Sequence, residues 1–203
     1  MNLKKILPFF SYLFHPIFIP VFATLFYLFS YDNRFENKEK LFILLQISII
    51  TIVIPILTYL LLRSLNKVDS VMVSGIEQRK IPLVLLCFLI ILLIRKSVPL
   101  DYYPELHFFF LGGLFSTLAA LILLFFKTKA SLHMMTISAL TAFVIGLSVQ
   151  LQVQNTFVIA MLVFMNGIVA RSRLEMKAHT PNELIIGFLV GVIPQMALWF
   201  VWL

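Results

Sequence analysis

Cysteine and charge are scarce in this chain. Its 203 residues include a single cysteine, so no disulfide can form within the chain and a metal site built from several cysteines is excluded. Charged residues make up 12% of the sequence and hydrophobic residues 61%, whereas a soluble domain has about a quarter of its residues charged. With a mean hydropathy of +1.02, the chain requires a lipid environment.

Linkers, low-complexity tracts and internal repeats are also missing from the sequence. Short connections join the apolar stretches, so we expect residues 1–203 to form a single transmembrane domain. The first apolar stretch is too long for the apolar core of a signal peptide and lacks a small-residue cleavage site. We therefore expect it to be retained.

Long apolar stretches dominate what is present. A helix needs about 20 apolar residues to cross the hydrocarbon core of a bilayer, and most of the stretches reach or approach that length. Arg95 and Lys96 end the third after a short run, while Pro8, Pro16 and Pro20 predict a kink in the first. We predict an all-α, polytopic membrane helix bundle with six or seven transmembrane helices. The stretches are Ile6–Tyr31, Leu41–Leu65, Ile81–Ile94, His107–Phe126, Met134–Leu151, Thr156–Ala170 and Asn182–Leu203.

The net charge of +7 indicates which partners the chain meets. In a soluble protein this excess would raise the question of nucleic acid. Here the basic residues lie between apolar stretches, where they meet lipid headgroups or an anionic substrate. We expect the bilayer and a membrane lipid phosphate as partners, no nucleic acid, and a location in the inner (cytoplasmic) membrane of a bacterium.

Polar residues collect in three clusters, Glu77–Pro82, Lys127–His133 and Arg171–Glu183. Two apolar stretches separate each cluster from the next, and two crossings return the chain to the same side of the membrane. Ionisable groups cost about 2.5–3.5 kcal/mol each at the centre of a membrane helix, so a convergent set indicates function. The alternative is that basic residues at helix ends anchor the helices, and that lone histidines such as His15 and His107 only pack.

The third cluster carries the most specific pattern. Ser172-Arg173 is followed by five residues, His179, three residues and Glu183. This resembles the signature of the type 2 phosphatidic acid phosphatase superfamily, which also contains the vanadium-dependent haloperoxidases, with Glu183 in place of the family's Asp. Gly187–Gly191 is similar to the glycine-spaced helix that often follows the motif. The resemblance implies a phosphatidic acid phosphatase-like core for the bundle.

The second cluster is similar to the family's Pro-Ser-Gly-His motif. Ser131 and His133 occupy the places of its serine and histidine, while Ala130 and Leu132 replace its proline and glycine. This motif follows the first cluster and precedes the third, which is the order of the three motifs in the family.

The first cluster is the least similar. The family has a lysine, six residues and an Arg-Pro pair, of which this chain keeps Pro82. Ile81 stands where the arginine belongs and Ser74 where the lysine belongs. Arg79 or Lys80 could reach the same phosphate from one or two positions away.

The resemblance implies phosphoryl transfer without a metal or other cofactor. His179 would be the nucleophile that forms a phosphohistidine, Glu183 its orienting carboxylate, and His133 the acid that protonates the leaving group. Arginine suits phosphate because its planar fork donates two parallel hydrogen bonds. The implied phosphate-binding residues are Arg173, Ser131, Lys129, Arg79 and Lys80.

The residues after His179 read as a helix start, with Thr180 as N-cap and Pro181 in the first helical position. A helix N-terminus favours an anion through its free N–H groups and its dipole. The same residues form a capping-box pattern, in which Glu183 would fold back onto the N-cap. Capping and orientation of His179 therefore stand as alternative roles for Glu183.

These observations lead to one principal hypothesis and one alternative. The first is a metal-independent membrane lipid phosphatase, a phosphoric ester or diphosphate hydrolase that acts on a lipid phosphomonoester or a polyprenyl diphosphate through a phosphohistidine. The second is a catalytically inactive relative that binds lipid phosphate or a partner membrane protein, because Ile81, Leu132 and Glu183 depart from the motifs. A transporter is disfavoured by the absence of an inverted repeat.

Overall fold

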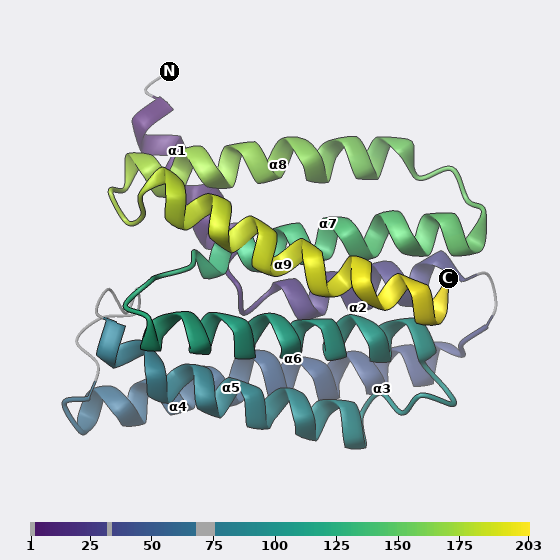
Figure 1. The fold of residues 1–203 in the computed structure, drawn as a ribbon. Helices are drawn as coiled ribbons and strands as arrows, with labels where there is room; N and C mark the ends of the chain where they lie inside the picture. The colour runs from purple at the N-terminus through teal and green to yellow at the C-terminus, as the bar shows by residue number, and fades with distance from the viewer. Residues whose placement is uncertain (1–2, 32–33, 68–75) are drawn as a thin grey trace.

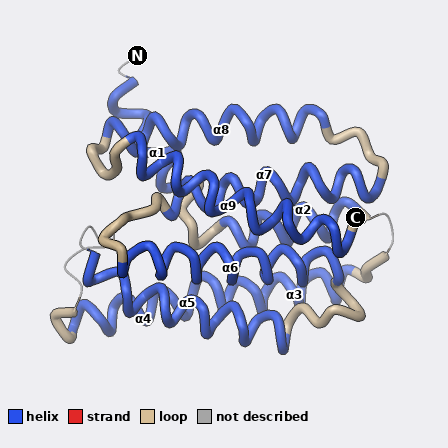
Figure 2. The backbone as a smooth tube through the Cα atoms, viewed as in Figure 1, coloured by secondary structure: helices blue, strands red, loops and turns tan. Residues whose placement is uncertain are grey.

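The computed structural model describes residues 3–31, 34–67 and 76–203, which fold into helices that run roughly along one axis (Figure 1). Short loops join them, and the described residues contain no strand (Figure 2). The helices are α1 Leu3–Leu13, α2 Ile19–Ser30, α3 Asn37–Ser48, α4 Ile54–Ser64, α5 Ile76–Lys96, α6 Pro104–Phe125, α7 Leu132–Leu151, α8 Thr156–Glu175 and α9 Pro181–Trp202, and a π-helical turn, Ile49–Val53, joins α3 to α4.

Within the described ranges, five helical segments are long and apolar enough to cross a membrane. The prediction of an all-helical membrane bundle is therefore confirmed, whereas six or seven crossings are not. The first predicted stretch is divided into helices of 11 and 12 residues, and α5 carries charged residues at both of its ends. The five segments are Asn37–Ser64, Pro104–Phe125, Leu132–Leu151, Thr156–Glu175 and Pro181–Trp202.

The proline-rich first stretch breaks completely where a kink was predicted. α1 ends at Leu13 and α2 begins at Ile19. Pro16 lies between them and has no N–H to donate, and its ring disfavours the helical conformation for the preceding His15. The two halves then pack in different places, α1 along α8 and α2 against α3 and α7.

The central helix of the bundle is α7. Most of its residues are buried, whereas the other four spanning segments turn most of their surface outward. It packs against α9 and α8 and also contacts α2 and α6. Because α7 is surrounded in this way, the residues at its N-terminus lie among the ends of several other helices.

Two glycines bring α9 against α7. A Cβ atom added at Gly187 would lie 2.5 Å from the backbone oxygen of Ser131, and one added at Gly191 would collide with the backbone oxygen of Met135. Small residues four apart allow two membrane helices to approach backbone to backbone. The N–H of Ser131 donates to the Glu183 carbonyl at 3.0 Å, so the first turns of α7 and α9 are joined.

Candidate functional site

The three polar clusters of the sequence meet at one end of the bundle, at the left of Figure 1, where α5, α7 and α9 begin and α8 ends. Arg79 Nη1 donates to the carbonyl of Ala130 at 3.3 Å. The Nζ atom of Lys129 lies 3.8 Å from Glu183 Oε1. Together with the bond between Ser131 and Glu183, these contacts tie one residue of each cluster to its neighbours.

His179 and Glu183 form a short polar contact, with 2.7 Å between Nδ1 and Oε2. The same oxygen accepts the N–H of Thr180 at 3.3 Å, and the N–H of Glu183 donates to Thr180 Oγ1 at 3.4 Å. Glu183 therefore caps α9 and holds His179 at once. The two roles posed as alternatives by the sequence are compatible, because His179 directly precedes the N-cap residue and one carboxylate oxygen reaches both.

The protonation of His179 follows from these contacts. A carboxylate only accepts, so the ring proton lies on Nδ1 and Nε2 carries a lone pair. The pKa of His179 is lowered to about 4, chiefly by burial and also by the charges of Arg79 and Arg173, while its bond to Glu183 opposes the change. At neutral pH His179 is thus an uncharged imidazole, which is the form a nucleophile needs.

His133 is buried near the start of α7. Its Nε2 lies 3.1 Å from the carbonyl oxygen of Ser11, and its ring stands edge-to-face against His15 with 5.1 Å between centroids. The charges of Arg173 and His179 act on it. The structure therefore brings both predicted histidines into one electrostatic environment.

Arg79 and Arg173 supply buried positive charge. Their residues are 7% and 2% exposed, and their charges act on each other and on His179. Burying a guanidinium group costs free energy that an anion or a set of acceptors must offset. With Lys129 close by, these groups make this end of the bundle suited to an anion.

Two predicted phosphate-binding residues have other contacts. Lys80 pairs with Glu77, with 2.8 Å between Nζ and Oε2, and its Nζ lies 5.3 Å from the centroid of the Phe125 ring. Ser131 is fully buried and is the N-cap of α7, where its Oγ accepts the N–H of Met134 at 3.5 Å. Ser74, which stands in the place of the first motif's lysine, lies outside the described residues.

The sequence reasoning missed the contribution of α1. Ser11 is fully buried, and its hydroxyl lies 2.7 Å from that of Ser172, which donates in turn to the Leu7 carbonyl at 2.7 Å. His15 lies beside His133, although the sequence assigned it only to packing. The available signal was the His15-Pro16 dipeptide, which places an unsatisfied helix end within an otherwise apolar stretch.

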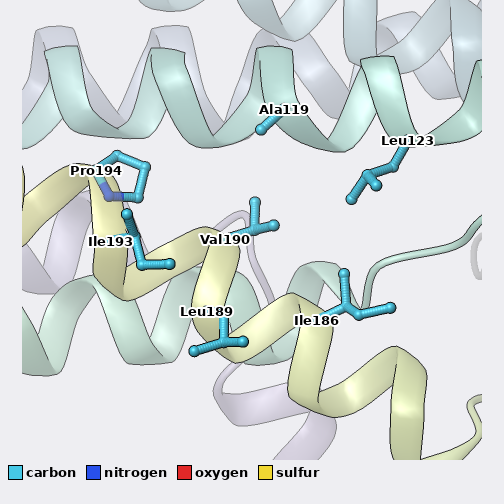
Figure 3. A pocket seen from close by; sticks show the side chains of 7 residues that line it. All are labelled: Ala119, Leu123, Ile186, Leu189, Val190, Ile193 and Pro194. Atoms are coloured by element: carbon cyan, nitrogen blue, oxygen red, sulfur yellow. The ribbon is translucent and has the colours of Figure 1, made fainter.

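An apolar groove of about 360 Å³ lies between α6 and α9 (Figure 3). It begins one turn of α9 beyond Glu183 and reaches the last turn of α6. Its walls are entirely hydrophobic, as expected of a surface that meets acyl chains. The lining includes Ala119, Leu123, Ile186, Val190 and Pro194.

Across the described ranges, no group of three or more His, Cys, Asp or Glu side chains is arranged to hold a metal ion. Comparison of the chain with protein-family models, with curated proteins and with solved structures gives no match. The likeness to the type 2 phosphatidic acid phosphatase superfamily thus rests on the motif residues of the sequence.

Proposed function

We propose that the protein is a membrane lipid phosphatase that transfers the phosphoryl group of a lipid phosphomonoester or polyprenyl diphosphate to His179 and then to water. The contact between His179 Nδ1 and Glu183 carries this proposal. It leaves the Nε2 lone pair of a neutral imidazole for attack, in a site with two buried arginines. A nucleophile, an orienting base partner and fixed positive charge are the parts that phosphoryl transfer requires.

The chemistry would proceed in two steps. In the first, a bond forms between phosphorus and His179 Nε2 while the bond to the leaving oxygen breaks, and His133 gives that oxygen a proton. In the second, water attacks the phosphohistidine and gives a proton to His133, which passes it to the departing inorganic phosphate as His179 is restored. Arg79 and Arg173 would stabilise the charge on the phosphoryl oxygens throughout.

The lipid character of the substrate is supported by the groove between α6 and α9. A lipid whose phosphate meets the arginines would need an apolar path for its chain, and the groove begins one helical turn from Glu183. A water-soluble phosphate would gain nothing from this surface.

A second candidate is an inactive relative that binds lipid phosphate. Ile81, which takes the place of the family's first-motif arginine, is 47% exposed, and Lys80 pairs with Glu77. In this candidate the remaining cations would hold a phosphate without assisting its transfer.

The test is phosphate release by detergent-purified protein from three substrates: a long-chain phosphatidic acid, a polyprenyl diphosphate and a water-soluble aryl phosphate. His179→Ala is the matched control, and the reactions are repeated with chelator. We expect release that requires His179, persists with chelator and is accompanied by an acid-labile phosphohistidine. Equal release by wild type and His179→Ala on every substrate would overturn the enzyme, and retained lipid-phosphate binding would then favour the second candidate.

A further inference from the structure

We propose that the break between α1 and α2 is a positioning element of the site. The carbonyl oxygen of Ser11 holds the proton of His133 on Nε2, so that Nδ1 is the nitrogen that exchanges a proton with the substrate. The catalytic part of this inference rests on the proposed phosphatase function, whereas the tautomer of His133 can be measured without it.

The proline at the break makes the Ser11 carbonyl available. In a continuing α-helix the N–H of His15 would donate to Ser11, but it donates instead to Tyr12 at 3.3 Å, and the N–H of Phe14 donates to Phe10 at 2.9 Å. Pro16 has no N–H. Among the described residues, no backbone N–H thus satisfies this carbonyl, which is one of the unpaired groups at a helix C-terminus. His133 Nε2 instead donates to the Ser11 carbonyl oxygen, at 3.1 Å.

A carbonyl oxygen only accepts, so the bond to Ser11 fixes a proton on Nε2 of His133. His179 is fixed in the same manner at its other nitrogen, Nδ1, by Glu183. The two histidines are therefore held by opposite ring atoms. Nε2 of His179 and Nδ1 of His133 are the nitrogens left for chemistry.

This assignment gives a balanced first step. The phosphorus forms a bond to His179 Nε2 as its bond to the leaving oxygen breaks. That oxygen takes a proton from Nδ1 of His133, which the neutral ring has received there from a hydroxyl of the bound phosphate. His133 remains as a neutral imidazole that still donates its Nε2 proton to Ser11. An acceptor on the far nitrogen orients an acid in the same way that a partner orients a catalytic base.

Two further contacts from the break keep His133 in place. The ring of His15 meets it at an interplanar angle of 89°, and His15 is itself held by the N–H of Ile17, which donates to Nδ1 at 3.4 Å. The Ser11 hydroxyl bonds to Ser172, the neighbour of Arg173 in the third motif. α1 therefore connects the second and third motifs, which lie about forty residues apart in the sequence.

The test restores the missing donor with Pro16→Ala. The helix can then continue, and the N–H of His15 can take the Ser11 carbonyl from His133. We expect turnover of an alkyl phosphate, a poor leaving group, to fall about tenfold or more, while an aryl phosphate with a good leaving group loses less than about threefold. Pro8→Ala, in the same helix but away from His133, should leave both rates unchanged. Equal losses on both substrates, or no loss on either, would overturn the inference while leaving the phosphatase intact.

His15 gives a second test that does not alter the backbone. His15→Phe keeps a ring against His133 and should retain activity on both substrates. His15→Ala removes the ring and should show the same selective loss on the alkyl phosphate. A loss in His15→Phe as large as that in His15→Ala would contradict a role in packing and orientation.

The tautomer itself provides a readout independent of activity. Nitrogen NMR spectra of histidine-labelled protein in detergent, with the His133 signal assigned by its loss in His133→Gln, should show the Nε2–H form in wild type. The spectrum of Pro16→Ala should show a mixture of forms. If wild type instead carries the proton on Nδ1 of His133, the inference is overturned whatever the enzyme assays give.

Discussion

The two ends of the bundle bury charge in opposite ways. At the end away from His179, the buried carboxylate of Glu105 accepts hydrogen bonds from Tyr27 at 3.0 Å and Tyr31 at 2.6 Å, and Arg34 lies 3.9 Å from it. Glu105 also lies in the first turn of α6, where the helix dipole favours negative charge. Its charge is thus met on several sides by the protein.

At the other end, Arg79 and Arg173 are buried within each other's electrostatic influence. Two like charges in such an environment are unfavourable for stability, whereas a carboxylate surrounded by donors is favourable. Burial of charge is therefore not itself a sign of function. The acidic end joins α2 to α6 through these contacts, whereas the basic end brings like charges together, which is the feature on which the proposed anion site rests.

Removing His179 should produce the largest effect on activity. We expect His179→Ala to lower phosphate release more than about a thousandfold, because it removes the proposed nucleophile. The unfolding temperature in detergent should change little, because the free-energy cost of burying this polar ring offsets what its bond to Glu183 contributes. A large drop in the unfolding temperature would place His179 with the structural groups instead.

Removing Glu105 should lower stability and leave activity nearly unchanged. Glu105→Ala leaves the hydroxyls of the buried Tyr27 and the half-buried Tyr31, together with Arg34, without this acceptor, which we expect to cost about 2–4 kcal/mol of stability. Activity per folded molecule should stay within about twofold, because this group lies at the opposite end of the bundle from the proposed chemistry. Assays of folded protein below its unfolding temperature check both points, and activity loss without loss of stability would contradict the comparison.

Separating α7 from α9 should affect stability and activity together. Gly187→Ala forces a methyl group against the backbone of Ser131 and should destabilise by about 1–3 kcal/mol. Gly167→Ala is the matched control, because an added Cβ there meets nothing within 4 Å. We expect the control to retain activity and to be as stable as wild type or slightly more stable.

The pH dependence should follow the titration of His179. Because its pKa is about 4 in the folded protein and 6.5 ordinarily, its stabilising contribution is complete above pH 6.5 and is lost as the pH falls toward 4. The rate constant kcat/KM should fall below about pH 4, when Nε2 of His179 takes up a proton. Glu183→Gln keeps the capping contact but loses the charge. In this variant the acidic limb of the kcat/KM profile, where the rate falls, should move to still lower pH. A limb near pH 6.5 in both proteins would contradict the assignment.

The smallest effect is expected in the apolar groove. Ala119→Phe would fill part of the space between α6 and α9. We expect it to slow hydrolysis of a long-chain lipid phosphate about threefold to tenfold, since one displaced apolar contact is worth about 1 kcal/mol. The water-soluble aryl phosphate should be hydrolysed at the wild-type rate. Equal slowing of both would show that the groove does not hold the lipid chain.

The features predicted correctly from the sequence are local ones. The start of α9 follows from Thr180 and Pro181. The sequence posed capping and the contact with His179 as alternative roles of Glu183, and the structure has both because His179 directly precedes the N-cap. The direction of each side chain was harder to predict from the sequence. Adjacent helical residues differ by about 100° around the axis, so the sequence could not decide between Arg79, which is buried, and Lys80, which is not.

Contacts between residues far apart in the chain could not be predicted from the sequence. His133 and Ser11 are 122 residues apart, and Ser11 and Ser172 are 161 apart. Nothing in the local pattern indicates that α1 folds back along α8. The predicted six or seven crossings are not confirmed, because the break around Pro16 yields two helices each about half the length that a bilayer requires.

The glycine contacts of α9 set how the protein would respond to its membrane. Where two helices touch backbone to backbone, as at Gly187 and Gly191, no flexible side chain remains between them to absorb a change in tilt. Bilayers differ in thickness by a few ångströms, and helices adapt by tilting. We expect that adjustment to fall on α3, α4 and α5, which lie away from this seam (Figure 1). The spacing between the helices that carry His133 and His179 would then be the same in a thin membrane as in a thick one.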